Sequence, residues 1–157
     1  MYSKYHFSWD DIPDWFTYLK APLALTALGL NLIKIPAGKG YTFMHRHEHQ
    51  EEVYIILRGR GIIHIEGNDI SLVEGDIVRV SPKALRAVKA EDQESIILLC
   101  AGAVESNLAL DPNSKYLYSD GRPDWENLPP WYKGNKKIKE LNKQIRASRE
   151  KNIKKLI

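Results

Sequence analysis

The middle of the chain consists of eight short segments that are rich in Ile and Val and are separated by Gly, Pro, Asn and Ser. Runs of this length at even spacing, with turn residues between them, are typical of an antiparallel sandwich or barrel. No apolar pattern of helical period and no internal repeat occurs between residues 29 and 103. We therefore expect an all-β barrel across this range. The expected strands are 29–35, 41–47, 52–58, 61–66, 70–73, 77–80, 84–90 and 95–103.

Length and composition favour one domain. The chain has 157 residues, of which 43% are hydrophobic, enough for a core of its own. No apolar run approaches the roughly 20 residues of a membrane span, and the first residues, MYSKYHFSWDD, lack the regions of a signal peptide. The single cysteine, Cys100, stands in the apolar run SIILLCAGA, where we expect a core side chain and not a nucleophile. A chain without an internal disulfide fits a reducing compartment, so we expect a cytoplasmic protein that does not bind a membrane.

The two ends of the chain differ in composition from the barrel region. Residues 1–28 are rich in aromatic side chains, among them Trp9 and Trp15, and we expect a short helix or turn there that packs onto the barrel or a partner subunit. Residues 104–157 form a C-terminal extension. Its part from 119 to 135 is rich in Pro, Gly and Trp, which predicts an ordered irregular segment, and a basic helix is expected from about residue 135.

The net charge of +3 is unevenly distributed. Residues 133–157 carry ten Lys or Arg and two Glu, a charge of +8, whereas the other 132 residues carry 13 basic and 18 acidic side chains, a charge of −5. A basic arm can bind nucleic acid or an anionic membrane. This tail, however, keeps a helical stripe of Ile138, Leu141 and Ile145 and has no aromatic residue after Tyr132. We interpret it as a solvated helix and expect no nucleic-acid partner.

Imidazoles and carboxylates gather at the end of the second expected strand and the start of the third. His45, His47 and His49 occupy alternate positions, and Glu51 and Glu52 follow. Residues i and i+2 of a strand point to the same side, so His45 and His47 can direct two imidazoles at one point, about 6–7 Å apart along the chain. His49 lies two residues further on, beyond easy reach of the same ion.

These residue types bind first-row transition metals. Two neutral imidazoles and a carboxylate from the next strand suit iron(II), manganese, nickel, zinc or copper, and open coordination positions then allow catalysis. The sequence thus predicts a divalent metal site on His45, His47 and Glu52, with His49 and Glu51 as alternative ligands. Tyr54 shares the side of Glu52, so we expect it to line the cavity and contact a substrate.

The spacing of this cluster resembles the first motif of the cupin superfamily. That motif runs from a glycine through a short spacer to H-x-H, then three or four residues to a glutamate and six residues to a glycine. Here Gly40 precedes His45, and Glu52 and Gly59 follow at the motif's spacing. The resemblance covers about residues 29–103. It implies a small double-stranded β-helix, or jelly-roll, barrel with a metal site inside it, usually in a dimer or larger assembly.

The second cupin motif is altered in this chain. The family pattern is glycine, five residues, proline, one residue, glycine, two residues and histidine, and GDIVRVSPKALRAV from Gly75 resembles it. Ser81 takes the position of the proline, Lys83 that of the glycine and Arg86 that of the histidine. In metal-binding members this histidine is usually the fourth protein ligand, whereas a guanidinium cannot ligate a cation.

Three arrangements of Arg86 are compatible with the sequence. In the first, the two histidines and Glu52 hold a metal, and Arg86 binds an anionic substrate through its bidentate fork. In the second, no metal binds and Arg86 pairs with Glu52 inside the barrel. In the third, Arg86 points away and the site uses His49 or Glu51. The alternation in ALRAVKA predicts that Arg86 faces the interior, where a guanidinium needs a counter-charge.

The barrel does not by itself select a function, because cupins include dioxygenases, isomerases, decarboxylases and sugar-binding sensor domains. The resemblance and the site residues favour a metal-dependent oxygenase (a dioxygenase) or isomerase that acts on a small anionic metabolite. The alternative is a non-catalytic cupin that binds a sugar or an organic acid and has lost its metal. We also expect a homodimer, because Ile and Val occupy both sides of strands such as EVYIILR, which indicates that one sheet is covered from outside.

Overall fold

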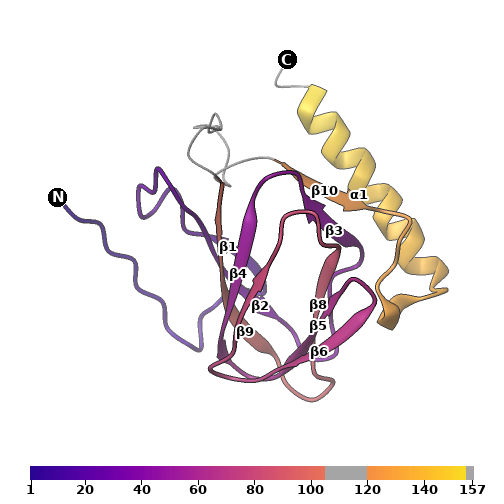
Figure 1. Ribbon diagram of the computed structural model, residues 1–157, viewed down its shortest axis with the longest axis horizontal. Helices are drawn as coiled ribbons and strands as arrows, with labels where there is room; N and C mark the ends of the chain where they lie inside the picture. Colours follow the sequence, from indigo (N-terminus) through magenta and orange to yellow (C-terminus); the bar gives the residue numbers. More distant parts are fainter. Residues whose placement is uncertain (105–119, 155–157) are drawn as a thin grey trace.

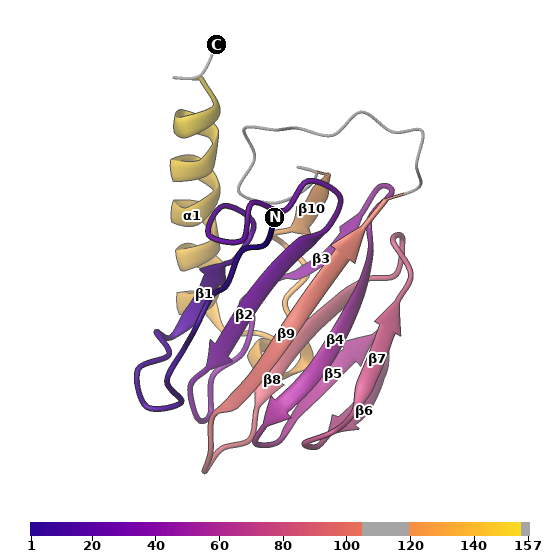
Figure 2. The ribbon, with the colours of Figure 1, turned by 90° about the vertical axis from the view of Figure 1, so that its left-hand side faces the viewer.

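Two five-stranded sheets pack face to face in the computed structural model, which describes residues 1–104 and 120–154 (Figure 1, Figure 2). The first sheet has the order β1-β2-β9-β4-β7 and the second the order β10-β3-β8-β5-β6, and the strand pairs within these residues are antiparallel. The expected all-β jelly-roll barrel with a C-terminal helix is confirmed. The strands are β1 Trp15–Tyr18, β2 Gly29–Ile35, β3 Met44–His47, β4 Glu51–Arg58, β5 Gly61–Ile65, β6 Asn68–Leu72, β7 Ile77–Val80, β8 Arg86–Ala90, β9 Ile96–Ala103 and β10 Gly121–Asp124.

Strands β2 to β9 correspond to the eight expected segments, whereas the sequence does not predict β1 and β10. Each of these adds an edge to one sheet, since β1 pairs with β2 and β10 pairs with β3. The chain turns at Ser8–Asp11, as expected for the N-terminal segment, but is extended over Trp15–Tyr18. The segment expected to be irregular contains β10, whose sequence GRPD has a Gly and a Pro, residues that weaken a strand but are tolerated at a sheet edge.

Apolar side chains fill the space between the two sheets because successive residues of a strand point to opposite sides. In β4, Glu52, Tyr54 and Ile56 are buried while their neighbours are partly exposed. Cys100 is a free thiol within this core, as its apolar surroundings in the sequence predict. The larger aliphatic members of the core are Ile33, Ile35, Ile56, Ile63, Leu72, Val80, Val88, Ile96 and Leu98.

The N-terminal segment covers the outer side of the first sheet. Ile12 and Leu19 pack against Leu32 and Ile97, which belong to β2 and β9, and all four are at most 4% exposed. Ile12 and Leu19 of the N-terminal segment therefore pack on the barrel of their own chain. This contact accounts for part of the apolar outer surface without a second subunit.

The C-terminal extension returns to the barrel through a short 3-10 helix, η1 (Pro130–Tyr132), and a long helix, α1 (Lys136–Lys154). Asn135 caps α1, because its Oδ1 accepts two backbone N–H groups of the first turn. Figure 1 shows α1 on the side of the barrel that carries β10 and β3. The remaining parts of the extension, 105–119 and 155–157, lie outside the described residues. No helix within the described residues is long and apolar enough to cross a membrane.

Two side chains attach the helical part of this extension to the barrel. The indole N–H of Trp131 donates to the carbonyl oxygen of Tyr41 at 3.1 Å. The amide nitrogen of Asn142 donates to the carbonyl oxygens of Thr42 at 2.8 Å and Trp125 at 3.2 Å, and Asn142 is only 1% exposed. A buried polar side chain is costly unless it is hydrogen-bonded, so Asn142 fixes how α1 is seated.

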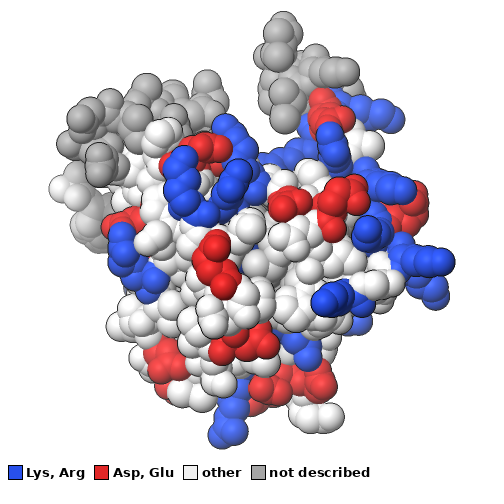
Figure 3. Space-filling view, turned by 45° about the vertical axis from the view of Figure 1, so that its right-hand side comes forward, with Lys and Arg blue, Asp and Glu red and all other residues white. Residues whose placement is uncertain are grey.

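Basic side chains lie along the exposed side of α1, where acidic side chains are interspersed with them (Figure 3). Such a mixed surface is typical of a solvated helix. The absence of a nucleic-acid partner stays a prediction. Among the described side chains, the helix makes ion pairs of Lys139 with Glu126, Lys143 with Glu140, and Arg146 with Glu150.

Candidate metal centre

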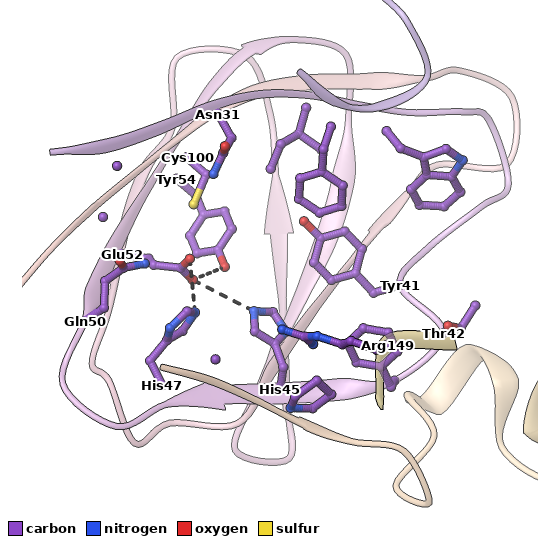
Figure 4. A pocket seen from close by; sticks show the side chains of 18 residues that line it. Asn31, Tyr41, Thr42, His45, His47, Gln50, Glu52, Tyr54, Cys100 and Arg149 are labelled. Carbon is purple, nitrogen blue, oxygen red and sulfur yellow. Dashed lines mark hydrogen bonds and ion pairs between the residues drawn. The ribbon is translucent and has the colours of Figure 1, made fainter. Parts of the chain in front are cut away.

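The three predicted metal ligands meet inside the barrel. His45 and His47 lie on β3, and Glu52 lies on β4 of the other sheet. The Nε2 atom of His47 is 3.3 Å from Oε1 of Glu52, and the Nε2 atom of His45 is 3.9 Å from Oε2. One ligand atom from each residue lies within 4.8 Å of the others. Figure 4 shows the imidazoles and the carboxylate pointing toward one another. These three residues could hold one metal ion.

The two oxygens of Glu52 have different surroundings. Oε2 accepts hydrogen bonds from the Tyr54 hydroxyl at 2.6 Å and from Nη2 and Nε of Arg86 at 2.7 and 3.2 Å. Oε1 faces His47 instead. The protein therefore holds one oxygen in place and leaves the other directed at the imidazole, which is the position from which it can ligate a metal.

Arg86 is fully buried on β8, and it is paired with His45 in the register of β3 and β8. Its Nη1 donates to the carbonyl oxygens of Pro82 at 2.9 Å and Ala84 at 3.0 Å, while Nε and Nη2 bind Glu52. Arg86 does not line the cavity described below. The ion pair of the second arrangement is thus present, yet the predicted metal ligands still converge. A contact between Arg86 and a substrate stays a prediction, and this placement does not favour it.

Asp120 orients His47, and this residue was not predicted from the sequence. Oδ1 of Asp120 is 2.6 Å from Nδ1 of His47, and Oδ2 accepts the backbone N–H groups of His49 and Gln50 at 2.8 and 2.9 Å. Asp120 is 3% exposed and stands immediately before β10. Because a carboxylate acceptor favours the proton on Nδ1, Nε2 of His47 keeps the lone pair that a metal ligand needs.

The charges of the cluster suit a transition metal. Burial lowers the pKa of His45 below its ordinary value, so this imidazole is neutral, as a ligand must be. Burial acts against the charge of His47 as well, but Glu52 and Asp120 outweigh it and raise the pKa of His47, so a metal bound at Nε2 would have to displace the proton that these carboxylates favour. Burial also opposes the charge of Glu52, yet the two histidines and Arg86 hold the pKa of Glu52 well below its ordinary value. The carboxylate is therefore ionised at neutral pH and available to a cation.

The cluster opens onto a cavity of about 250 Å³ (Figure 4). Three of its buried polar atoms, Nδ1 of His45, Oδ1 of Asn31 and Oε1 of Gln50, have no hydrogen-bond partner among the described residues. Asn31, Gln50 and Arg149 were not predicted from the sequence to lie in this wall. The aromatic members of the wall, other than the histidines, are Trp15, Phe16, Tyr41, Phe43 and Tyr54.

Two further groups in the cavity wall are protonated at neutral pH. Burial raises the pKa of the Tyr54 hydroxyl well above its ordinary value, so Tyr54 remains a hydrogen-bond donor to Glu52. Burial likewise raises the pKa of the Cys100 thiol well above its ordinary value. Cys100 is therefore not a nucleophilic thiolate.

The structure does not bring the two alternative ligands into the cluster. Glu51 is on the outer side of β4 and pairs with Arg79 at 2.7 Å. The backbone N–H of His49 binds Asp120, and the His49 side chain does not line the cavity. His49 and Glu51 are therefore not placed to replace the three converging residues.

Comparisons with known proteins agree with this fold. Residues 31–102 match the cupin domain family. A cupin protein from Bacteroides fragilis is 34% identical, with a TM-score of 0.61 over 69% of this chain and 88% of that one. A putative sugar phosphate isomerase from Acidithiobacillus ferrooxidans is 28% identical, with a TM-score of 0.50 over 56% of this chain and 57% of that one.

Curated relatives match over shorter stretches. An oxalate-binding protein from Thermotoga maritima is 38% identical over 45 residues, which are 29% of this chain and 36% of that protein. An uncharacterized protein from Methanocaldococcus jannaschii is 29% identical over 66 residues, which are 42% of this chain and 52% of that protein. The chain thus spans about half, or less, of the length of these curated relatives.

Proposed function

This chain belongs to the cupin superfamily, and we propose that it is a metal-dependent enzyme that acts on a small anionic metabolite. The observation that carries the proposal is the convergence of His45, His47 and Glu52 on one side of a cavity. The donor set fits a divalent transition metal such as iron, manganese, nickel or zinc. The proposal includes a cytoplasmic location, supported by the buried free thiol of Cys100.

Oxygenase chemistry is the first candidate. Two histidines and one carboxylate are the ligand set of non-haem iron oxygenases, and a metal bound there would act as a Lewis acid with open coordination positions. Tyr54 and Arg86 hold the carboxylate of Glu52, and Asp120 holds the imidazole of His47. The aromatic wall excludes water around a bound ligand, which strengthens the electrostatic contacts made inside the site.

Two alternatives also have supporting observations. An isomerase is favoured by the similarity to the putative sugar phosphate isomerase. A non-catalytic binding protein for an organic acid is favoured by the ion pair between Arg86 and Glu52, which can persist without a metal, and by the short match to an oxalate-binding protein.

Elemental analysis of freshly purified protein tests the metal. We expect about one iron, manganese, nickel or zinc per chain. His47→Ala and the double substitution of His45 and His47 by alanine should abolish the metal content with little loss of fold, measured by circular dichroism. His64→Ala is the matched control, because His64 pairs with Asp69 away from the cavity. Full metal content in the double variant would refute the assignment.

Oxygen uptake separates the reaction classes. The metal-loaded protein is offered small carboxylates and sugar phosphates, oxygen is followed with an electrode, and products are followed by NMR. An oxygenase consumes oxygen with its substrate, whereas an isomerase converts its substrate at constant oxygen. Binding without turnover in the metal-loaded protein would favour the non-catalytic alternative.

A further inference from the structure

One guanidinium remains available to a ligand in the cavity, and it comes from outside the barrel. Arg149 belongs to α1 and lines the same cavity as His45, His47 and Glu52. Figure 4 shows its side chain extending from the helix into the cavity region, on the side of His45. Within the part of the chain that the structure describes, Arg149 has no hydrogen-bond or ion-pair partner.

The seating of α1 determines that Arg149 faces the cavity. Asn142 is buried against the barrel and binds the carbonyl oxygens of Thr42 and Trp125. Residues seven apart on a helix are separated by about two turns and lie on the same face. Arg149 is seven residues after Asn142, so the contact that fixes the rotation of the helix also directs Arg149 toward the barrel. Thr42 itself lines the cavity.

The other basic groups near the site are engaged elsewhere. The donors of Arg86 are occupied by Glu52 and two carbonyl oxygens, and Arg86 does not line the cavity. On α1, Arg146 pairs with Glu150 at 2.9 Å. Arg149 is therefore the described guanidinium that an anion in the cavity can reach without breaking an existing ion pair.

We propose that Arg149 binds the anionic group of the ligand, a carboxylate or a phosphate, and thereby selects small anions for this cavity. A guanidinium binds either oxyanion through two parallel N–H donors. The sequence predicted that Arg86 would bind an anionic substrate; in this proposal Arg149 of the C-terminal helix does so instead. The inference rests on the proposed function for the place of the ligand beside the metal ligands, but anion binding by Arg149 itself does not require the metal.

Titration calorimetry on the metal-free full-length protein tests Arg149 directly, with oxalate and inorganic phosphate as separate probes. We expect Arg149→Ala to weaken binding of at least one probe about 10- to 100-fold, as the loss of charge-assisted hydrogen bonds predicts. Arg149→Lys should lose less affinity, because lysine keeps the positive charge but lacks the two parallel N–H donors of the guanidinium. The probe that depends on Arg149 identifies the ligand group as carboxylate or phosphate. Arg146→Ala is the matched control, one turn away on the same helix, and should bind as the wild type does.

The same variants separate this inference from the proposed function. Arg149→Ala should keep the metal content of the wild type, because Arg149 is not one of the three converging ligands. Arg149-dependent anion binding in a protein that holds no metal would sustain the inference while the proposed function fails. Three results would overturn the inference. The wild type could bind neither probe, the wild type and Arg149→Ala could bind with equal affinity, or Arg146→Ala could lose as much affinity as Arg149→Ala.

Discussion

At the scale of single residues, Glu52 decides whether a metal and an internal ion pair can coexist. If its carboxylate acted as one undivided partner, Arg86 and a metal would compete for it. Instead, Oε2 is shared by Tyr54 and Arg86, whereas Oε1 is directed at His47. The ion pair and metal ligation are therefore geometrically compatible. The ion pair also keeps Glu52 from being an isolated buried charge when no metal is bound, a state that is costly.

Replacing Arg86 tests this division of the carboxylate. Arg86→His places an imidazole opposite His45, so we expect a fourth nitrogen ligand and tighter binding of manganese or zinc. The metal-free variant should lose about 3 kcal/mol in its free energy of unfolding, because Glu52 loses its buried partner. Calorimetric metal titration and urea denaturation measure the two effects. Arg79→His, at an exposed ion pair, should change neither, and unchanged metal affinity in Arg86→His would mean that residue 86 is misplaced.

Asp120 and Asp69 form a natural comparison, since each contacts the Nδ1 atom of a histidine at 2.6 Å. Only the partner of Asp120, His47, belongs to the metal cluster. We expect Asp120→Asn to lower metal affinity about 10- to 100-fold, because the amide no longer fixes the tautomer and orientation of His47. Asp69→Asn should leave metal affinity unchanged. An equal effect of the two substitutions in metal titrations would exclude a specific positioning role for Asp120.

At the scale of secondary structure, local patterns predict most of the barrel but little of what surrounds it. Strands β2 to β9 alternate or form short apolar runs between turn residues, and both signals are local. The cluster of His45, His47 and Glu52 was also predictable, because strand geometry and a short spacing place them together. Asp120 and Arg149 were not, because they are 73 and 104 residues from His47 and His45 in the sequence and reach the site only through the path of the C-terminal extension.

The turn between β4 and β5 depends on a glycine. Gly59 has a φ of +83°, and a Cβ at this position would overlap the carbonyl oxygen of Ser95. Gly67, in the next turn, has a φ of +86° but no atom within 4 Å of such a Cβ. We expect Gly67→Ala to cost about 1–2 kcal/mol from its left-handed backbone. Gly59→Ala should cost about 2 kcal/mol more, because it adds overpacking. Equal free energies of unfolding by urea denaturation would contradict the steric argument.

At the scale of the whole molecule, segments outside the barrel complete its cavity. Residues 31–102 match the cupin domain, but the cavity wall also includes Trp15 and Phe16 from the N-terminal segment and Arg149 from α1. Asp120, which orients His47, lies beyond the domain as well. The barrel therefore supplies the predicted metal ligands and part of the aromatic wall, while the two extensions supply the rest of that wall, the Arg149 guanidinium and one positioning contact. Differences in ligand preference among such proteins can arise in these extensions without a change in the metal ligands.

The N-terminal segment also determines where a second subunit could bind. Its inner residues, Ile12 and Leu19, already cover the first sheet, so an interface there must use the outward aromatic side chains. Tyr2 is 92% exposed, Tyr5 39% and Trp9 44%, so these aromatic side chains are available to contact a second subunit. We therefore retain the homodimer as a prediction and place its interface on this segment.

Sedimentation equilibrium at micromolar concentration tests the dimer, for which we expect twice the mass of one chain. Trp9→Glu should shift the equilibrium toward the monomer, because it would bury an unpaired carboxylate in the interface. Ile77→Glu is the matched control: Ile77 lies on β7, at the opposite edge of the first sheet from β1, and is 69% exposed. Dissociation by Ile77→Glu with no effect of Trp9→Glu would move the interface to β7, and a wild type that sediments as a monomer would contradict the dimer altogether.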